Sequence, residues 1–131
     1  MSRCLIQSSL LILLTLGILG CAPTPEGTYM GFCENSTYGG KAEIILILKI
    51  KGNDVSGSIN ITGELGGSAP IDGLIEGDQI TFSSDAGDGM PITWMGIIEE
   101  NQISGRYRVS VHQQLKKQGV VDQAGIWAVR K

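Results

Sequence analysis

Histidine and cysteine are scarce in this chain of 131 residues, which holds one histidine and three cysteines. Hydrolytic or redox catalysis needs a base or nucleophile with an orienting partner, and a zinc site needs several histidine or cysteine ligands at set spacings. The single histidine, His112, follows the polar end of an expected strand and lies on its outward side. We therefore predict no catalytic centre, no metal site and no cofactor, and we expect the protein not to be an enzyme.

Charged residues are also few, at 18% of the chain, and acidic residues outnumber basic ones by 13 to 10. A protein with this balance lacks the basic patch that nucleic acid requires, so we expect no nucleic-acid partner. The segment Asp85–Gly89 combines carboxylates with glycines, but it lacks the alternating aspartates and the distal glutamate of a calcium loop. The sequence predicts a hairpin loop there, ended by Pro91.

Helical periodicity is absent after residue 26, where apolar and polar residues alternate in short runs and 17 of the chain's 19 glycines lie. This pattern is typical of an all-β domain with many short strands. An internal repeat supports it, because residues 73–81 (GLIEGDQIT) align without gaps on residues 96–104 (GIIEENQIS) with five identities. Residues 48–56 (LKIKGNDVS) form a looser third copy. Each copy predicts a strand, a two-residue turn and a returning strand.

Two-residue turns set the register of each expected hairpin, because cross-strand partners follow by counting outward. Gly52-Asn53 and Gly77-Asp78 place glycine first, which suits a type II′ turn, and Glu100-Asn101 offers Asn101 for a positive φ. Lys51 then faces Asp54, and we expect these two to form an ion pair. The other expected cross-strand partners are Ile50 and Val55, Leu46 and Ile59, Ile44 and Ile61, Ile75 and Ile80, Gly73 and Phe82, Ile98 and Ile103, Gly96 and Gly105, Trp94 and Tyr107, and Ile92 and Val109. The apolar pairs of each hairpin then share one face, which is the agreement that a real hairpin requires.

Two further strands, expected near Thr28–Glu34 and Ala124–Arg130, bring the total to eight. An antiparallel meander of this size has two unpaired edges unless it closes into a barrel. We therefore predict a single domain over residues 27–131, an all-β, eight-stranded antiparallel up-and-down β-barrel. A β-sandwich is the alternative, although consecutive hairpins with short loops need no long Greek-key crossing.

The chain has one long apolar run, Leu10–Leu19, which follows Arg3 and closes on Gly20 and Cys21. It is short for a membrane span and has the layout of a secretory signal peptide. Its ending, Ile18-Leu19-Gly20-Cys21, resembles the bacterial lipobox. The resemblance implies that residues 1–20 are cleaved off and that Cys21 is acylated with diacylglycerol and palmitate.

A lipidated Cys21 implies a lipoprotein of the cell envelope, with membrane lipid as its partner and a short proline-containing linker over residues 21–26. Because Ala22 and not aspartate follows Cys21, the sorting rule of such lipoproteins implies the outer membrane if the cell is Gram-negative. Loss of Arg3 with the signal leaves nine basic and 13 acidic residues, a charge of −4. Cys4 is lost as well, so Cys33 has no intramolecular partner, and we expect it to be a small buried apolar residue.

Gly27-Thr28-Tyr29 at the start of the first strand, together with a last strand that contains Trp127 and ends in Arg130, resembles the calycin group. This group comprises lipocalins, avidins and small periplasmic barrel inhibitors. Lipocalins open with Gly-x-Trp and cover that tryptophan with an arginine, so the resemblance implies that Tyr29 takes the tryptophan position and Arg130 covers it. Biotin binding is not implied, because Gly31 and Cys33 stand where avidins place hydrogen-bonding side chains.

Trp94 and Tyr107, beside the opposed glycines Gly96 and Gly105, are the most suggestive interior residues. Opposed glycines leave a space that an aromatic ring can fill, which is a purely structural interpretation. Alternatively, Trp94, Tyr107 and Trp127 line a small apolar pocket at the barrel mouth.

Two functions therefore stay open. In the first, the protein is a membrane-anchored lipoprotein that acts as a non-enzymatic binding module for a small apolar ligand. In the second, the barrel is filled, and the protein is an envelope lipoprotein that engages or inhibits another protein. The last loop, from His112 to Gln123, has an expected helical turn over Gln113–Gln118 and would be a lid, a partner-binding arm or a plain connection.

Overall fold

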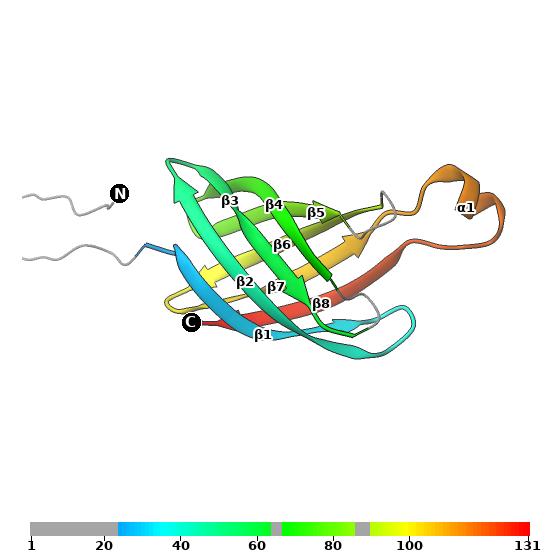
Figure 1. Cartoon of the computed structure of the whole chain (residues 1–131), viewed down its shortest axis with the longest axis horizontal. Helices are drawn as coiled ribbons and strands as arrows, with labels where there is room; N and C mark the ends of the chain where they lie inside the picture. Colours follow the sequence, from blue (N-terminus) through cyan, green and yellow to red (C-terminus); the bar gives the residue numbers. More distant parts are fainter. Residues whose placement is uncertain (1–23, 64–66, 86–89) are drawn as a thin grey trace, which may run out of the picture.

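The structure, a computed structural model, describes residues 24–63, 67–85 and 90–131. Its elements are β1 (Gly27–Asn35), β2 (Lys41–Lys51), β3 (Asp54–Ile61), β4 (Gly67–Glu76), β5 (Gln79–Asp85), β6 (Pro91–Glu99), β7 (Gln102–Val109), α1 (Gln113–Lys117) and β8 (Gln123–Arg130). Each strand pairs antiparallel with the next, and β8 pairs with β1 to close the barrel (Figure 1). The predicted up-and-down β-barrel is confirmed, and the β-sandwich alternative is wrong.

The predicted register is confirmed in all three hairpins. In the β2–β3 hairpin Ile50 is opposite Val55, and in the β6–β7 hairpin Trp94 is opposite Tyr107. The β4–β5 hairpin places Gly73 opposite Phe82, as counting from its turn predicts. Lys51 and Asp54 are also register partners, but the one salt bridge among the described residues joins two other side chains. The turn lengths therefore determine which side chains point inward, whereas the predicted ion pair is not formed.

The turns differ from expectation at one residue. Gly77 has a φ of 62° and Glu100, at the equivalent place in the repeat, has a φ of 56°. The positive φ thus falls on Glu100 and not on Asn101, because both hairpins use the same turn type, in which the first residue carries it. The expectation that Asn101 would take it was wrong.

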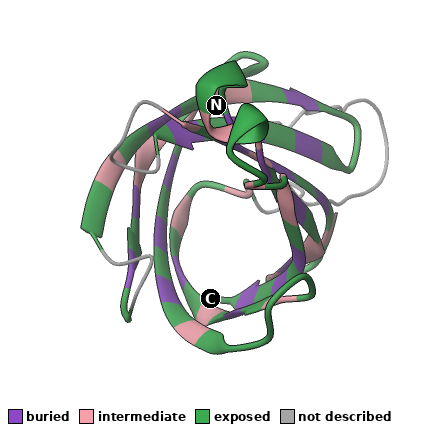
Figure 2. Cartoon of the chain, turned by 90° about the vertical axis from the view of Figure 1, so that its right-hand side faces the viewer, coloured by how far each residue is buried: buried purple, intermediate pink, exposed green. Residues whose placement is uncertain are grey.

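The core lies inside the barrel, and Figure 2 shows buried and exposed residues alternating along its strands. Buried and exposed residues alternate without a break along β5. Apolar side chains occupy the inward positions, and Ser84 is the one polar residue that is buried in the described part of the chain. Alternation of this kind is what a sheet with one face on the core and one in solvent requires.

The two ends of the barrel differ. At one end, the turn end, three two-residue turns join the strands, at Gly52–Asn53, Gly77–Asp78 and Glu100–Asn101. The opposite end, the loop end, carries the longer connections, including residues 110–122 with α1, which projects beyond the strands (Figure 1). In the described residues, no helix has the length and apolar character that crossing a membrane requires.

The start and the end of the described chain contact each other at the turn end. The Tyr29 hydroxyl donates to the carbonyl oxygen of Pro25 at 2.7 Å, and the Lys131 ammonium donates to that of Thr24 at 3.1 Å. The Lys131 ammonium also lies 5.6 Å from the centre of the Tyr29 ring. A cationic side chain therefore covers the Tyr29 ring, and this side chain is Lys131 and not Arg130.

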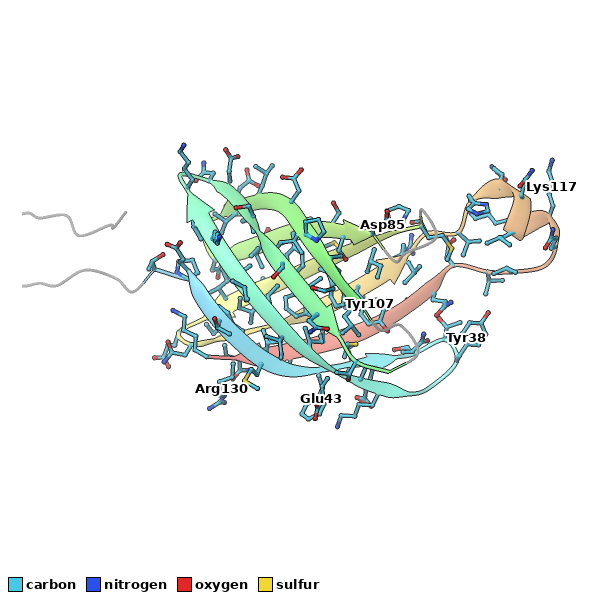
Figure 3. The ribbon with its side chains drawn as sticks, in the orientation of Figure 1. Tyr38, Glu43, Asp85, Tyr107, Lys117 and Arg130 are labelled. Atoms are coloured by element: carbon cyan, nitrogen blue, oxygen red, sulfur yellow. The ribbon has the colours of Figure 1, made fainter. Side chains whose placement is uncertain are left out.

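Arg130 is not that cover. It is exposed, points away from the barrel (Figure 3), and donates a hydrogen bond to Gln102 at 3.0 Å. The physical reason is strand parity: Val129 is buried, so its neighbour Arg130 faces outward. Lys131, beyond the strand, is free of that constraint and folds back over the ring.

Candidate functional site in the barrel interior

Four aromatic side chains meet inside the barrel. Phe82 and Trp94 are stacked with ring centres 6.0 Å apart, and the Tyr107 ring lies 5.0 Å from Trp94 on the neighbouring strand. The Trp127 ring stands edge-on to both Phe82 and Trp94, at 5.7 Å and 5.6 Å. The sequence-predicted residues Trp94, Tyr107 and Trp127 are therefore brought together, and Phe82 joins them.

Trp127 occupies the space beside the opposed glycines. A β-carbon built on Gly96 would lie 2.8 Å from the indole ring of Trp127, so the ring is seated against the glycine. The indole N–H of Trp127 is shared between the carbonyl oxygens of Met95 and Arg106, both at 3.1 Å. Trp127 thus has the geometry of an aromatic ring that fills the gap left by strand glycines.

Trp94 is held by a serine from the loop-end half of the barrel. Its indole N–H donates to the Ser84 hydroxyl at 3.0 Å, and both residues are buried. Ser84 is the second-last residue of β5, so this bond lies near the mouth of the loop end. Because Ser84 is the acceptor, its own hydroxyl hydrogen remains available to a further acceptor.

The Tyr107 hydroxyl has no hydrogen-bond partner, although it is buried. Among the described residues, every other buried side-chain nitrogen or oxygen atom has a hydrogen-bond partner. The ring is held against β8, since a β-carbon on Gly125 would lie 2.5 Å from its Cζ atom. Figure 3 shows Tyr107 within the barrel, in the half toward the loop end. A buried unpaired hydroxyl costs about 1–3 kcal/mol and therefore needs an explanation.

Cys33 lies close enough to Tyr107 to influence its ionisation. It is buried, is unpaired as expected, and sits on β1 two residues before the strand ends at the loop end. Burial raises the pKa of the Cys33 thiol, and a backbone hydrogen bond from Ala42 opposes that shift. Burial, followed by the effect of Cys33, raises the pKa of Tyr107 to about 12. Both groups therefore keep their protons at neutral pH.

We call Cys33, Ser84 and Tyr107 the polar cluster. All three are buried and lie toward the loop end, where Cys33 neighbours Tyr107 and Ser84 is linked to the Tyr107 ring through Trp94. The other buried hydroxyl, that of Tyr29, lies toward the turn end and is bonded to Pro25. In the described part of the chain, no three side chains of the histidine, cysteine, aspartate and glutamate types come together in a group that could hold a metal ion. What the cluster offers is neutral hydrogen bonding: two hydroxyls and a thiol beside aliphatic and aromatic surface.

The rim of the loop end is ordered by hydrogen bonds between elements. The Asn35 side chain donates to Gln123 at 2.7 Å and accepts from the backbone of Thr37, which ties the β1–β2 connection to β8. The Asp122 carboxylate accepts from the backbone N–H of Val111 at 2.9 Å. That bond is the main reason why the pKa of Asp122 is lowered.

The expected helical turn of the last loop is confirmed as α1, over Gln113–Lys117. None of its residues is buried, and the basic Lys116 lies 3.7 Å from Asp122. His112 precedes the helix as its exposed N-cap residue. The helix therefore contributes no buried residue to the barrel interior. Its loop is held at the base by the contacts of Asp122 with Val111 and Lys116.

We expect Tyr107 to make the protein sensitive to alkali. An unfolded tyrosine loses its proton near its ordinary pKa of 10.0, whereas folded Tyr107 keeps its proton up to about 12. Between these values the unfolded state binds fewer protons, so the free energy of unfolding falls as the pH rises, by about 2–3 kcal/mol in total. Urea unfolding at about pH 9 and about pH 12 would measure the loss.

Tyr107→Phe is the control for this result. It keeps the ring and lacks the proton, so its stability should fall less with pH than that of the wild type, while the raised pKa values of Tyr29 and Cys33 act on both proteins. At neutral pH the variant should be about 1 kcal/mol more stable, because the unpaired hydroxyl is gone. Equal alkaline losses in the two proteins would contradict the assignment.

Sequence patterns pointed to the aromatic residues and missed Ser84. A signal for it exists: Ser84 shares the inward parity of Ile80 and Phe82 and is the one polar residue on that side of β5. The aspartate-rich loop after β5 was not tested, because residues 86–89 lie outside the described residues, as do the signal segment and Cys21. The chain matches no protein-family model and no curated protein sequence.

Proposed function

We propose that this protein is a lipid-anchored, non-enzymatic binding module of the bacterial cell envelope that holds a small apolar ligand at the loop end of its barrel. One observation carries the proposal: the Tyr107 hydroxyl is buried inside the barrel and has no hydrogen-bond partner. Folded proteins pair nearly all such groups, and a bound molecule is one way to complete the pairing. If Tyr107 only filled the core, phenylalanine would stabilise the barrel more, because it has no hydroxyl to leave unpaired.

Two features of the barrel support the loop end as the entry. The turn end carries short turns, and Tyr29 and Lys131 hold the linker there by hydrogen bonds to Pro25 and Thr24. The loop end carries the longer connections, and binding residues in β-barrels commonly lie at such an end, on loops held by a rigid scaffold. The inward side chains near this end are apolar, and they include Ile44, Ile61 and Val109.

The proposed anchor fits this orientation. Cys21 precedes Thr24 by three residues, which span at most about 10 Å. The carbonyl oxygen of Thr24 accepts a hydrogen bond from the Lys131 ammonium at the turn end. A lipid on Cys21 would hold the turn end near the membrane and leave the loop end facing away from it. In a Gram-negative cell this membrane is the outer membrane, since Ala22 follows Cys21.

Ligand binding can be tested through the two tryptophans. A brominated decane, its carboxylate and its methyl ester are added in turn to the purified protein, since bromine quenches an indole on contact. We expect at least one probe to quench the fluorescence saturably and Trp94→Phe to lose most of the quenching, because Trp94 is bonded to Ser84 near the loop end. Tyr38→Phe, at an exposed site, is the matched control. Quenching by none of the three probes would overturn the proposed function.

The anchor is tested by Cys21→Ser in the full chain. We expect the wild-type protein to incorporate labelled palmitate and to fractionate with membranes, and the variant to do neither. Cys33→Ser is the control, because Cys33 is buried in the barrel and should not affect labelling. Palmitate incorporation that survives Cys21→Ser would rule out the anchor without affecting the ligand site.

A second candidate function, engagement of an envelope protein, rests on the outer surface of the barrel. Exposed apolar side chains cluster there on β8, β1 and β2, and we call this group the outer apolar face: Met30, Phe32, Ile45, Ile47, Ile126 and Ala128. Met30 is 62% exposed and Phe32 47% exposed, although monomeric proteins rarely leave such side chains in a contiguous group. Phe32 is partly screened by the Lys41 ammonium, 4.5 Å from its ring centre.

A photocrosslinking residue tests this candidate. Placed at position 32 in the living cell, it should give one defined crosslinked protein, and the same residue at Ser83, which is exposed on β5 on the opposite side of the barrel, should not. The adduct should disappear when Ile45, which is paired with Met30, is replaced by glutamate. Identical crosslinks from both positions would dismiss the outer apolar face as a docking site.

A further inference from the structure

The polar cluster also indicates the chemistry of the ligand, an inference that rests on the proposed function. The cluster contains no charged side chain, and the buried residues of the described barrel include none. A ligand carrying a carboxylate or an ammonium group into this interior would leave its charge without a counter-ion, which is strongly unfavourable. An uncharged ligand avoids that cost.

The cluster offers donors more than acceptors. Tyr107 keeps its proton at neutral pH and has no acceptor for it. Ser84 accepts from Trp94, so its remaining hydrogen-bonding capacity includes its own proton. The Cys33 thiol keeps its proton as well and is a weak donor. The complementary group on a ligand is therefore one with a lone pair that accepts from these donors, such as a carbonyl oxygen.

The aromatic faces of the site are already occupied. Trp94 has Phe82 stacked at 6.0 Å and Tyr107 at 5.0 Å, and Trp127 packs edge-on to it. An aromatic ligand would have to displace one of these rings in order to stack. An alkyl chain would have to displace only aliphatic side chains of the loop-end half, such as Ile44 and Val109, which are themselves buried.

We infer that the ligand is an uncharged aliphatic molecule whose polar group is a carbonyl of the ester or ketone class, with its oxygen accepting from the Tyr107 hydroxyl. Ser84 is the second donor within the cluster. Selection against free fatty acids follows, because a fatty acid carries the same chain with a carboxylate at its end. Selection against plain alkanes follows as well, because an alkane leaves the Tyr107 hydroxyl unpaired.

The three brominated probes test this directly, since they differ only at the chain end. We expect the methyl ester to bind about tenfold more tightly than either the alkane or the carboxylate, the effect of one good buried hydrogen bond. In Tyr107→Phe the affinity for the ester should fall about tenfold, while that for the alkane stays unchanged. Ser84→Ala should weaken ester binding by a smaller factor, and Tyr38→Phe should change nothing.

The possible outcomes separate the two proposals. Ester and alkane binding equally well, or an ester affinity unchanged in Tyr107→Phe, would overturn the inferred ligand class and leave a ligand-binding barrel. Tightest binding of the carboxylate would overturn it as well. Binding of no probe would overturn the proposed function itself. If Tyr107→Phe fails to fold, the ratio of ester to alkane affinity in the wild type and in Ser84→Ala still decides the question.

Discussion

Gly105→Ala is expected to destabilise the barrel by at least about 3 kcal/mol, a large share of the stability of a domain of this size. A β-carbon on Gly105 would lie 2.6 Å from the Cα atom of Gly96 and would also press against the carbonyl oxygen of Met95. Both obstacles are backbone atoms of β6, so no side-chain rotation relieves the contact. The β6–β7 pair would have to separate where Gly96 and Gly105 face each other. Urea unfolding, followed by far-ultraviolet circular dichroism, measures the loss.

Two other glycines provide the comparison. Gly39→Ala puts a side chain into open space at a φ of 81°, so only backbone strain opposes it, and we expect a cost of about 1 kcal/mol. Gly96→Ala meets the side chains of Trp127 and Ile103 first and should fall between the two. If Gly105→Ala cost no more than Gly39→Ala, the close approach of β6 and β7 could not be important for stability.

The barrel could be predicted from the sequence because its signals are local and repeated. Alternating residues and two-residue turns determine register within each hairpin, and the registers place Ile50 against Val55 and Trp94 against Tyr107 before any long-range contact is considered. Closure was predicted because an antiparallel meander of eight strands has two unpaired edges unless it closes into a barrel. Cys33 was predicted to be a small buried apolar residue because it has no intramolecular partner, and it is buried.

The details that the sequence did not predict depend on contacts between distant segments. Lys131 covers Tyr29 because the chain end beyond β8 is free to fold back, which no periodicity encodes. Trp127 fits beside Gly96 from a strand that is not its hairpin partner. The unpaired hydroxyl of Tyr107 could not be predicted either, because a hydrogen-bond partner could have come from any neighbouring strand.

Packing and proposed binding are divided along the axis of the barrel. Trp127, whose indole N–H is fully used by two backbone oxygens, holds the interior beside the opposed glycines. Tyr107, one strand away, leaves its hydroxyl unused. Trp127→Ala should therefore act on stability, and Tyr107→Phe should act on ligand affinity while slightly raising stability at neutral pH. The proposed division of roles therefore predicts stability changes of opposite sign, a loss at Trp127 and a small gain at Tyr107.

Trp127→Ala is expected to lower the free energy of unfolding by about 3–5 kcal/mol, as truncation of a buried tryptophan does. The loss combines the apolar contacts with Phe82 and Trp94, 5.7 Å and 5.6 Å between ring centres, and the hydrogen bonds to Met95 and Arg106. Tyr38→Ala, which removes a ring that is 64% exposed, should change stability by less than about 0.5 kcal/mol. Urea unfolding of the two variants beside the wild type makes the comparison.

Free indole should restore part of the stability lost in Trp127→Ala, because a dry apolar cavity of this kind binds a ring that matches it. The indole N–H can also reach the carbonyl oxygens of Met95 and Arg106, which the truncation leaves without their donor. Benzene, which lacks that donor, should rescue less than indole, and neither should stabilise the wild type at the same site. Equal rescue by both molecules would show that Trp127 contributes through volume alone and that its two hydrogen bonds do not stabilise the fold.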